Sequence, residues 1–384
     1  DAPVITGGPD AVGLTETDSG LTDSGTLTIS DLDTTDTVTA AVDSVAISGT
    51  GAGSVPGTLT NAILQSFLSV SPTAILDGTE NSDTLTWDFN SGSEAFDFLA
   101  SGETLVLTYT VSATDDDGTP LSDTETVTVT ITGSNDAPAI TGGPDSVGLT
   151  ETDSGLTDSG TLTIADLDTT DNVTAAVNSV AVSGTGVGSV PGTLTNAILH
   201  SFLSVSPSAI LDGTENSDTL NWDFNSGSEA FDFLATGETL ILTYTVSATD
   251  DDGAPLSDTE TVTVTITGSN DAPVITGGPA STSLTETDSG LTDSGTLTIA
   301  DLDTTDNVTA AVDSVAVGGT GAGSVPGTLT NAILQSFLCV SPTAILDGTE
   351  TSDTLTWDFN SGSEAFDFLA TGETLILTYT VSAT

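Results

Sequence analysis

Apolar residues alternate with Thr, Ser and Asp over long stretches of this chain. The segments with this alternation are residues 26–33, 37–48, 84–89, 104–113 and 124–133. A period of two in segments rich in Thr, Val and Ile is typical of strands with one buried face. Clusters of Gly, Pro, Asp and Asn separate them, as in residues 48–57 and 114–120, and these clusters indicate turns. The pattern predicts an all-β fold of antiparallel Greek-key β-sandwiches.

Two segments depart from the alternation. Residues 61–70, NAILQSFLSV, begin with a capping-type Asn and place Ile63, Leu64, Phe67 and Leu68 at the spacing of a short amphipathic helix. Residues 93–102, SEAFDFLASG, are compatible with one further helical turn. We therefore expect a short helix in each sandwich.

The whole pattern recurs along the chain. The segment DAPVITGGP at Asp1 returns as DAPAITGGP at Asp136 and DAPVITGGP at Asp271, a spacing of 135 residues. A unit of this length is a complete domain, so we expect a linear array of domains at residues 1–135, 136–270 and 271–384. The third stops at the equivalent of Thr114 and lacks the final strand. We expect it to be part of a longer array.

The aromatic residues follow the repeat. Trp87, Tyr109, Phe67, Phe89, Phe96 and Phe98 each recur in both later copies and account for all aromatic residues of the chain. Because they alternate with polar residues along strands, we expect them to form a core in each domain, with Trp87, Trp222 and Trp357 buried. A sugar-stacking platform is the alternative interpretation.

The charge of the chain is entirely of one sign. It has 56 acidic residues, no Lys and no Arg, and a formal net charge of −56. No carboxylate can form a salt bridge to a side chain of Lys or Arg, so we expect neutralising cations from solution, and calcium is the cation that carboxylate and carbonyl oxygens select. Nucleic acid is excluded as a partner because its binding requires basic side chains. No apolar segment is long enough for membrane insertion.

Catalytic chemistry has little support in the sequence. The single His200 and the single Cys339 align with Gln and Ser in the other copies, so no nucleophile–base pair recurs. A lone Cys also excludes a disulfide within the chain. We therefore do not expect an enzyme.

Residues 109–138, YTVSATDDDGTPLSDTETVTVTITGSNDAP, resemble the end of a VCBS repeat and the cadherin pattern of a last strand followed by a D-x-N-D-x-x-P linker. GTLTISDLDTTD at residues 25–36 and WDFN at residues 87–90 are similar to VCBS segments as well. The resemblance covers every copy and implies bacterial cadherin-like domains of large surface or secreted prokaryotic proteins. The leading Asp of the cadherin linker is replaced by Gly133 and Gly268, so we expect one or two ions at each junction.

The cadherin-like resemblance implies calcium ligands at both domain junctions. For the first junction they are Glu16, Glu103, Asn135, Asp136, Asp166, Asp168 and Asp250. For the second junction they are Glu151, Glu238, Asn270, Asp271, Asp301 and Asp303. Asp31, Asp33 and Asp115 would face a preceding domain. Independently of the resemblance, the D-x-D and D-D-D-G clusters lie at strand ends, although Asp is also common in turns for local reasons.

These expectations combine into an extracellular or cell-surface array, stiffened by calcium, that serves as stalk or filament in adhesion, biofilm or matrix. Its partners would be other copies of the same repeat or chain, with surface glycans as a further possibility. The main alternative is a self-assembling fibre subunit whose third domain is completed by a strand from a neighbour. A carbohydrate-binding module is the lesser alternative.

Overall fold

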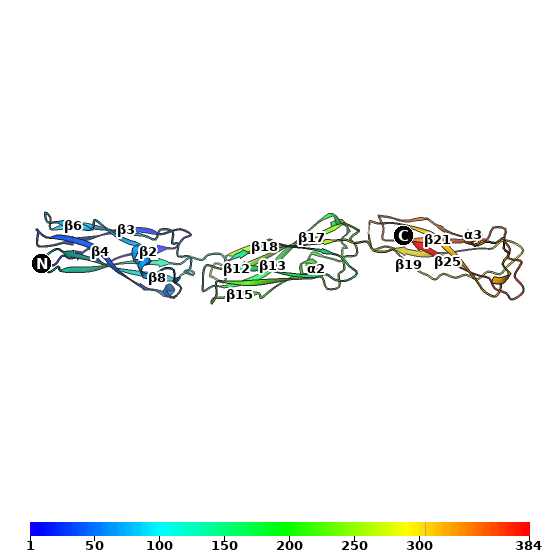
Figure 1. The fold of residues 1–384 in the computed structure, drawn as a ribbon, viewed down its shortest axis with the longest axis horizontal. Coiled ribbons are helices and arrows are strands. Elements are labelled where there is room, and N and C mark those ends of the chain that lie inside the picture. Colours follow the sequence, from blue (N-terminus) through cyan, green and yellow to red (C-terminus); the bar gives the residue numbers. More distant parts are fainter. Residues whose placement is uncertain (304) are drawn as a thin grey trace.

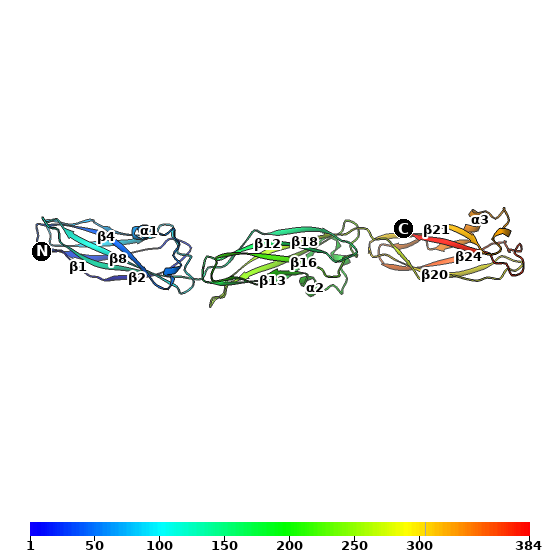
Figure 2. The same cartoon turned by 60° about the horizontal axis from the view of Figure 1, so that its bottom comes forward.

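The structure, a computed structural model, describes residues 1–303 and 305–384, and each repeat forms its own pair of β-sheets. The three repeats follow one another end to end as a rod (Figure 1). Turning the rod by 60° shows the same linear arrangement (Figure 2). The fold class predicted from the alternation is confirmed.

Repeat 1 (residues 1–135) contains the full set of elements. In chain order these are β1 (Val4–Thr6), β2 (Asp10–Thr15), β3 (Thr22–Ser30), β4 (Thr37–Ser48), the 3-10 helix η1 (Thr50–Gly53), α1 (Asn61–Ser66), β5 (Leu68–Ser71), β6 (Ala74–Asp77), β7 (Ser82–Asn90), β8 (Thr104–Asp115) and β9 (Ser122–Thr132). Four of them, β1, β2, β5 and β6, were not expected from the sequence, because short strands carry too few alternating positions to stand out.

Repeat 2 (residues 136–270) has the same order of elements. They are β10 (Ala139–Thr141), β11 (Asp145–Thr150), β12 (Thr157–Ala165), β13 (Asn172–Ser183), η2 (Thr185–Ser189), α2 (Asn196–His200), β14 (Leu203–Ser206), β15 (Ala209–Asp212), β16 (Ser217–Asn225), β17 (Thr239–Thr249) and β18 (Ser257–Thr267).

Repeat 3 (residues 271–384) has fewer elements in the part that the structure describes. They are β19 (Val274–Thr276), β20 (Thr292–Ala300), β21 (Asn307–Gly318), η3 (Ala322–Ser324), α3 (Asn331–Gln335), β22 (Leu338–Ser341), β23 (Ala344–Asp347), β24 (Ser352–Asn360) and β25 (Ile376–Ala383).

The two sheets of repeat 1 have the strand orders β1-β3-β7-β5 and β2-β9-β8-β4-β6, and repeat 2 has the same orders in its own strands. All pairings are antiparallel except β2 with β9 and β11 with β18, which are parallel. The chain therefore changes sheet between β1 and β2. Gly7 makes this change with a φ of +90°, which a residue without Cβ adopts at little cost.

The core lies between the two sheets and contains the aromatic residues that recur in the sequence. Trp87 is 2% exposed, and its indole N–H donates to Asp10 Oδ2 at 2.8 Å. The buried Tyr109 hydroxyl donates to the carbonyl of Leu64 at 2.9 Å and so holds the end of α1 against the sheet. Phe67 meets Phe89 edge to face at 6.2 Å between ring centroids, the geometry that aromatic quadrupoles favour.

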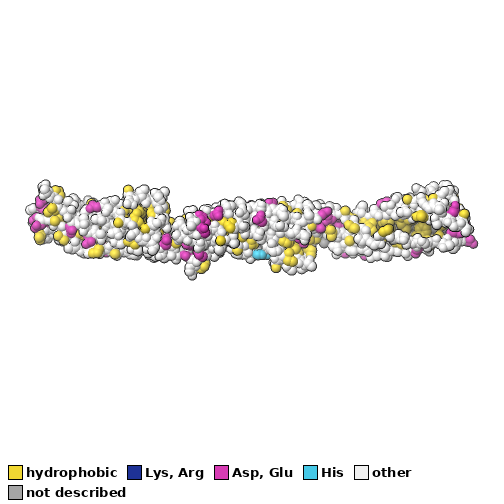
Figure 3. Space-filling model, turned by 90° about the horizontal axis from the view of Figure 1, so that it is seen from below, with side chains coloured by type: hydrophobic (Ala, Val, Ile, Leu, Met, Phe, Trp, Pro, Cys, Tyr) yellow, Lys and Arg dark blue, Asp and Glu magenta, His cyan; other side chains and the backbone are white. Residues whose placement is uncertain are grey.

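Repeat 3 is more open than the other two. Its smaller sheet has the order β23-β21-β25, and residues 280–285, the equivalent of β2, form no strand. Leu377 and Tyr379 are half-buried, whereas their equivalents Leu107 and Tyr109 are 0% exposed. Hydrophobic side chains line a hollow on this repeat (Figure 3).

The expectation that Trp357 is buried is wrong. It is half-buried rather than buried like Trp87 and Trp222. Its indole N–H has no acceptor, because residue 280 is Ala where Asp10 and Asp145 accept in repeats 1 and 2.

The two expected helical segments also need correction. The helix predicted over residues 61–70 ends at Ser66, and Leu68–Ser71 form β5, which pairs with β7. Thr60, not Asn61, caps the helix by accepting from the amide of Ile63. Strand pairing to β7 overrides the helical spacing of the apolar residues here.

Residues 93–102 form turns and no helix. The amide of Leu99 donates to the carbonyl of Phe96 at 3.0 Å. Phe96 itself has a φ of 70°, outside the range that a right-handed helix requires. No sequence pattern indicates this left-handed conformation, which non-glycine residues rarely adopt.

The openness of repeat 3 predicts different solvent access for the tryptophans. In variants that keep one Trp each and carry Phe at the other two positions, we expect acrylamide to quench Trp357 several-fold more strongly than Trp87 or Trp222. Stern–Volmer constants measured on the folded chain test this. Equal quenching of Trp357 and Trp87 would contradict the open packing of repeat 3.

Candidate metal centres at the domain junctions

Strand ends deliver the acidic residues to the junctions between repeats. The D-L-D segments follow directly after β3, β12 and β20, and Asp250 follows β17. These loops lie at one end of each repeat, which we call its leading end. In repeat 1 the loops are residues 31–36 and 115–118. Acidic side chains gather at both ends of the middle repeat (Figure 3).

The first junction brings Glu16, Asp97 and Asp136 together. One carboxylate oxygen from each lies within 4.8 Å of the others. Glu16 is 1% exposed, and its Oε1 accepts from the amide of Ser134 at 3.0 Å and from the Ser134 hydroxyl. The other oxygen of Glu16 is buried and has no partner. Three carboxylates this close repel one another unless a cation lies between them.

Asp136 connects this group to the next repeat. Its amide donates to Asp168 Oδ2 at 2.8 Å, and Asp168 belongs to the leading end of repeat 2. Its own Oδ2 is buried without a partner. The linker residue is therefore bonded to repeat 2 through its backbone while its side chain joins two carboxylates of repeat 1.

The leading end of repeat 2 holds the other predicted residues. Asp166, Asp168 and Asp250 are 3%, 1% and 4% exposed. Asp166 Oδ1 accepts from the amide of Asp168 at 3.1 Å, and Asp250 accepts from the amide of Leu256 and from Asn135 Nδ2 at 3.0 Å. Asp166 Oδ2, Asp168 Oδ1 and Asn135 Oδ1 remain buried without partners. Buried polar oxygens without partners are costly, so a proton or a cation on the carboxylates would relieve this cost.

The second junction repeats the first. Glu151, Asp232 and Asp271 have carboxylate oxygens within 4.8 Å of one another. The amide of Asp271 donates to Asp303 Oδ2 at 2.8 Å, and the amide of Asp303 donates to Asp301 Oδ1 at 3.1 Å.

Asn270 is arranged differently from Asn135. Its side-chain amide donates to the carbonyl of Asp271 at 2.9 Å instead of to a carboxylate of the next repeat. The sequence contains no counterpart of Asp250 for it to reach.

Glu103 and Glu238 lie outside the two carboxylate groups. Glu238 Oε2 accepts from the amide of Ala235 at 3.2 Å and from the hydroxyl of Ser189 at 3.3 Å, both in its own repeat. The residues that join the groups in their stead are Asp97 and Asp232. As junction ligands, Glu103 and Glu238 stay predictions from the resemblance.

Asp97 and Asp232 are not among the calcium ligands expected from the sequence. Asp97 lies between Phe96 and Phe98, which face the core, so its side chain is directed away from the core toward Glu16. The signal available was its recurrence in the F-D-F segment of every repeat. Asp36 and Asp117 are likewise absent from the expected ligands, and they lie beside Asp31, Asp33 and Asp115.

The glycine in place of the cadherin Asp has a steric cause. A Cβ at Gly133 would clash with the carbonyl oxygens of Leu99 and Ala100, and a Cβ at Gly268 would clash with those of Leu234 and Ala235. The backbone passes too close to this turn for any side chain, so an Asp ligand cannot stand at this point of the linker.

Burial and mutual repulsion raise the pKa of the junction carboxyls. Burial is the main cause for Asp168, whose pKa is raised to about 8. The amide hydrogen bond from Asp136 opposes this shift, and repulsion from Asp171 adds to it. The same two causes, burial first, raise the pKa of Asp171 to about 7 and that of Asp136 to about 6. The pKa of Asp303 is raised to about 6, mainly by burial.

The donor set fits a hard cation. Every ligand in the two groups is a carboxylate oxygen, and Asn135 adds an amide oxygen. Cys339 is exposed, and the ring of His200 contacts the carbonyl of Val177 at 3.2 Å, so neither contributes. Oxygen donors alone, several of them charged, are the preference of calcium, whereas zinc and copper select nitrogen and sulfur.

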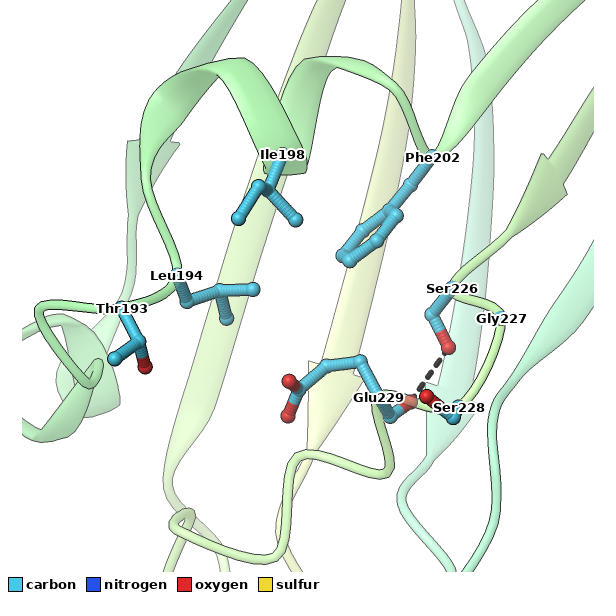
Figure 4. Close-up of a pocket in the computed structure, with 8 residues that line it drawn as sticks. All are labelled: Thr193, Leu194, Ile198, Phe202, Ser226, Gly227, Ser228 and Glu229. Atoms are coloured by element: carbon cyan, nitrogen blue, oxygen red, sulfur yellow. Dashed lines mark hydrogen bonds between the residues drawn. The ribbon is translucent and has the colours of Figure 1, made fainter.

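A pocket of about 440 Å³ lies away from these carboxylate groups, beside α2. Leu194, Ile198 and Phe202 form one wall of it, and the turn that carries Glu229 forms the other (Figure 4). The hydroxyl of Ser226 donates to the Glu229 carbonyl at 2.6 Å and closes this turn. Its lining joins no nucleophile to a base, and Phe202 is only 8% exposed, so it offers no aromatic face for a sugar.

No protein-family model and no curated protein matches the chain. Among solved structures, mouse Cadherin-23 EC22-24 aligns over 99% of this chain and 98% of its own at 13% identity, with a TM-score of 0.37. Human CDH23 EC21-23 aligns over 99% of both chains at 12% identity, with a TM-score of 0.38. With scores this low the likeness carries no argument, and the fold rests on the strands and pairings of the chain itself.

The raised pKa values predict that, in a calcium chelator, the chain loses stability as the pH rises. The folded chain holds protons that the unfolded chain releases, so stability falls from about pH 4, the ordinary value for Asp, to about pH 8. The lowered pKa values of exposed residues such as Asp77 act only below this window. Thermal melting across pH 4–8 measures the effect.

Calcium serves as the control for this pH dependence. Because a bound cation favours the ionised carboxylates, we expect calcium to flatten the fall in melting temperature. A melting temperature that rises with pH in chelator would contradict the buried, repelling arrangement of these groups.

Proposed function

We propose that the chain is an extracellular structural array, stiffened at its junctions by calcium, that acts as a stalk or filament in adhesion or matrix. The observation that carries this proposal is the double attachment of Asp136. Its side chain lies with Glu16 and Asp97 of repeat 1, and its amide is bonded to Asp168 of repeat 2. Asp271 is attached in the same way between repeats 2 and 3.

An ion at this point would tie two domains through one residue. Calcium bound by Glu16, Asp97 and Asp136 would fix the linker on repeat 1, and the amide of Asp136 already fixes it on repeat 2. The linker between β9 and β10, residues 133–138, forms no strand of its own. Without the ion, three close carboxylates repel each other and push the linker away from repeat 1.

The free energy of calcium binding can favour the ordered junction over the loose one. A ligand that binds only the ordered state stabilises it by about 2.7 kcal/mol at a hundredfold excess over its Kd. This energy raises the ratio of ordered to loose junctions about a hundredfold over its value without calcium, since 1.4 kcal/mol is a factor of ten. Calcium sites of extracellular modules have Kd values on the order of 10⁻⁴–10⁻³ M, so even a weak site at these junctions would serve in the extracellular setting that we propose.

The near-identity of the copies supports a structural role. The copies are nearly identical, so the array offers one shape repeatedly instead of several different sites. Among the described residues no helix is long and apolar enough to cross a membrane. Further copies of the repeat are the proposed partners, and the bacterial biofilm setting rests on the sequence resemblance to VCBS repeats.

Substitution of Asp97, the junction carboxylate not expected from the sequence, tests the proposal. We expect Asp97→Asn to shorten the maximum dimension of the particle in calcium, measured by small-angle X-ray scattering, because the first junction loses its ion and bends. The calcium-induced gain in stability falls by up to about 2.7 kcal/mol at a hundredfold excess over Kd. Asp232→Asn is expected to act in the same way on the second junction.

The matched control is Asp88→Asn. Asp88 lies exposed on β7, so its substitution changes the same charge outside any junction. We expect it to leave both the dimension and the calcium response unchanged. If wild type has the same scattering curve in calcium and in chelator, the junctions are not stiffened by calcium and the proposal fails.

A further inference from the structure

The pocket beside α2 combines an apolar wall with a single carboxylate. Leu194, Ile198 and Phe202 line one side, and Glu229 is the one ionisable residue among the described residues that line it. Figure 4 shows the Glu229 side chain extending from its turn toward Leu194, so the carboxylate lies opposite the apolar wall. The volume of about 440 Å³ is within the range of roughly 300–1,000 Å³ that is usual for ligand sites.

The apolar wall is held in place from the core. The ring of Phe202 meets that of Phe231 edge to face, at 6.1 Å between centroids. The carbonyl of Leu199 in α2 accepts from the buried hydroxyl of Tyr244 at 2.8 Å. The neighbouring Ile198 is 41% exposed. The wall is therefore formed before any ligand arrives, which lowers the entropic cost of binding.

The carboxylate wall is held by a closed turn. The hydroxyl of Ser226 accepts from the amide of Leu156 at 2.8 Å and donates to the Glu229 carbonyl at 2.6 Å. The amide of Phe231 donates to Glu229 Oε1 at 3.2 Å, whereas Oε2 accepts no hydrogen bond from the described part of the chain. One oxygen thus orients the carboxylate, and the other is free to accept from a ligand.

The chemistry of the lining restricts the occupant. An uncharged apolar ligand would cover the Glu229 carboxylate without pairing it, which is costly. A calcium ion needs six to eight oxygens and would leave the apolar wall unused. The fitting ligand therefore has an apolar stem and a cationic head. The chain has no Lys and no Arg, so a second copy of it cannot supply such a side chain.

An arginine of another protein has both parts. Its alkyl stem packs along apolar surface while its charged head stays at the polar rim. The guanidinium is weakly hydrated and matches the geometry of a carboxylate. The net charge of −56 also attracts a basic partner.

The residues of the pocket recur along the rod. The same residue types stand at the equivalent positions of repeats 1 and 3. Ile63 and Ile333 are each 41% exposed, like Ile198. The hydroxyls of Ser91 and Ser361 close the same turn at 2.6 Å. Recurrence along one chain favours a protein with several basic residues over a free small amine, because linked contacts add avidity.

We propose that the pocket beside α2 binds an arginine side chain of a basic partner protein. The alkyl stem lies against Leu194, Ile198 and Phe202, and the guanidinium pairs with Glu229. None of these residues belongs to the carboxylate groups at the junctions. The proposal adds a partner of stated chemistry to the structural role.

The test follows the methyl signals of Ile198 and Leu194 by NMR of the full chain while acetyl-Ala-Arg-Ala-amide is added. An ionic strength of about 0.15 M screens charges more than about 8 Å apart and so suppresses general attraction to the acidic surface. We expect both signals to shift and to saturate. Citrulline in place of arginine removes the charge, and 2-amino-3-guanidinopropionate shortens the stem. Each replacement is expected to weaken binding at least tenfold.

The matched variants are Glu229→Gln and Asp223→Asn. Gln keeps an oxygen for the amide of Phe231, so the turn is retained, and we expect at least tenfold weaker binding. Asp223 lies exposed on β16, and its substitution removes the same charge outside the pocket. It is expected to keep the wild-type affinity. Equal weakening by both variants would show general attraction to the acidic chain and overturn the proposal.

The wild-type chain alone also decides the question. The proposal fails if the two methyl signals do not move, or if the citrulline peptide binds as tightly as the arginine peptide. Hexylammonium that binds more tightly than the arginine peptide would assign the pocket to a small amine and overturn the protein partner. The arginine peptide is expected to bind in calcium and in chelator alike, so this proposal and the calcium stiffening can fail separately.

Discussion

One electrostatic constraint governs the structure: buried carboxylates converge in a chain that has no Lys and no Arg. Glu16, Asp166 and Asp168 are almost fully buried and keep oxygens without partners. Hydrophobic burial in the three cores stabilises the sandwiches, while the carboxylates at their ends oppose the compact state. Two remedies exist, protons at low pH or cations from solution. The raised pKa values describe the first, and the oxygen donors favour calcium for the second.

The location of this charge follows from the architecture. In a sandwich the core fills the space between the sheets, so charged loops are displaced to the two ends, where domains in series meet. Trp87 and Tyr109 anchor the middle of repeat 1, and Asp31 and Asp115 lie where β3 and β8 end. Junction chemistry and domain stability are thereby separated. We therefore expect that a junction residue can be replaced without disturbing the core. For the same reason, calcium is expected to change the stiffness of the junctions while each domain stays folded.

The carboxylate groups of the chain are of two kinds. The leading-end groups of repeat 1 lie on the loops that follow β3 and β8, whereas the Glu16–Asp97–Asp136 group includes the linker residue that is bonded to the next repeat. Only the second kind joins residues of one repeat to a residue fixed on the next, so the proposed stiffening depends on that kind.

The sequence by itself determined the all-β fold, the period of the array, the aromatic core and the lack of any Lys or Arg to pair with the carboxylates, because alternation, repetition and composition are local properties of the chain. It also selected Asp136, Asp168 and their equivalents through the junction motif. Tertiary structure alone decided the rest. Pairing to β7 placed the end of a predicted helix in β5, and the left-handed Phe96 placed Asp97 beside Glu16. Each depends on contacts between residues far apart in the chain, which no local pattern records.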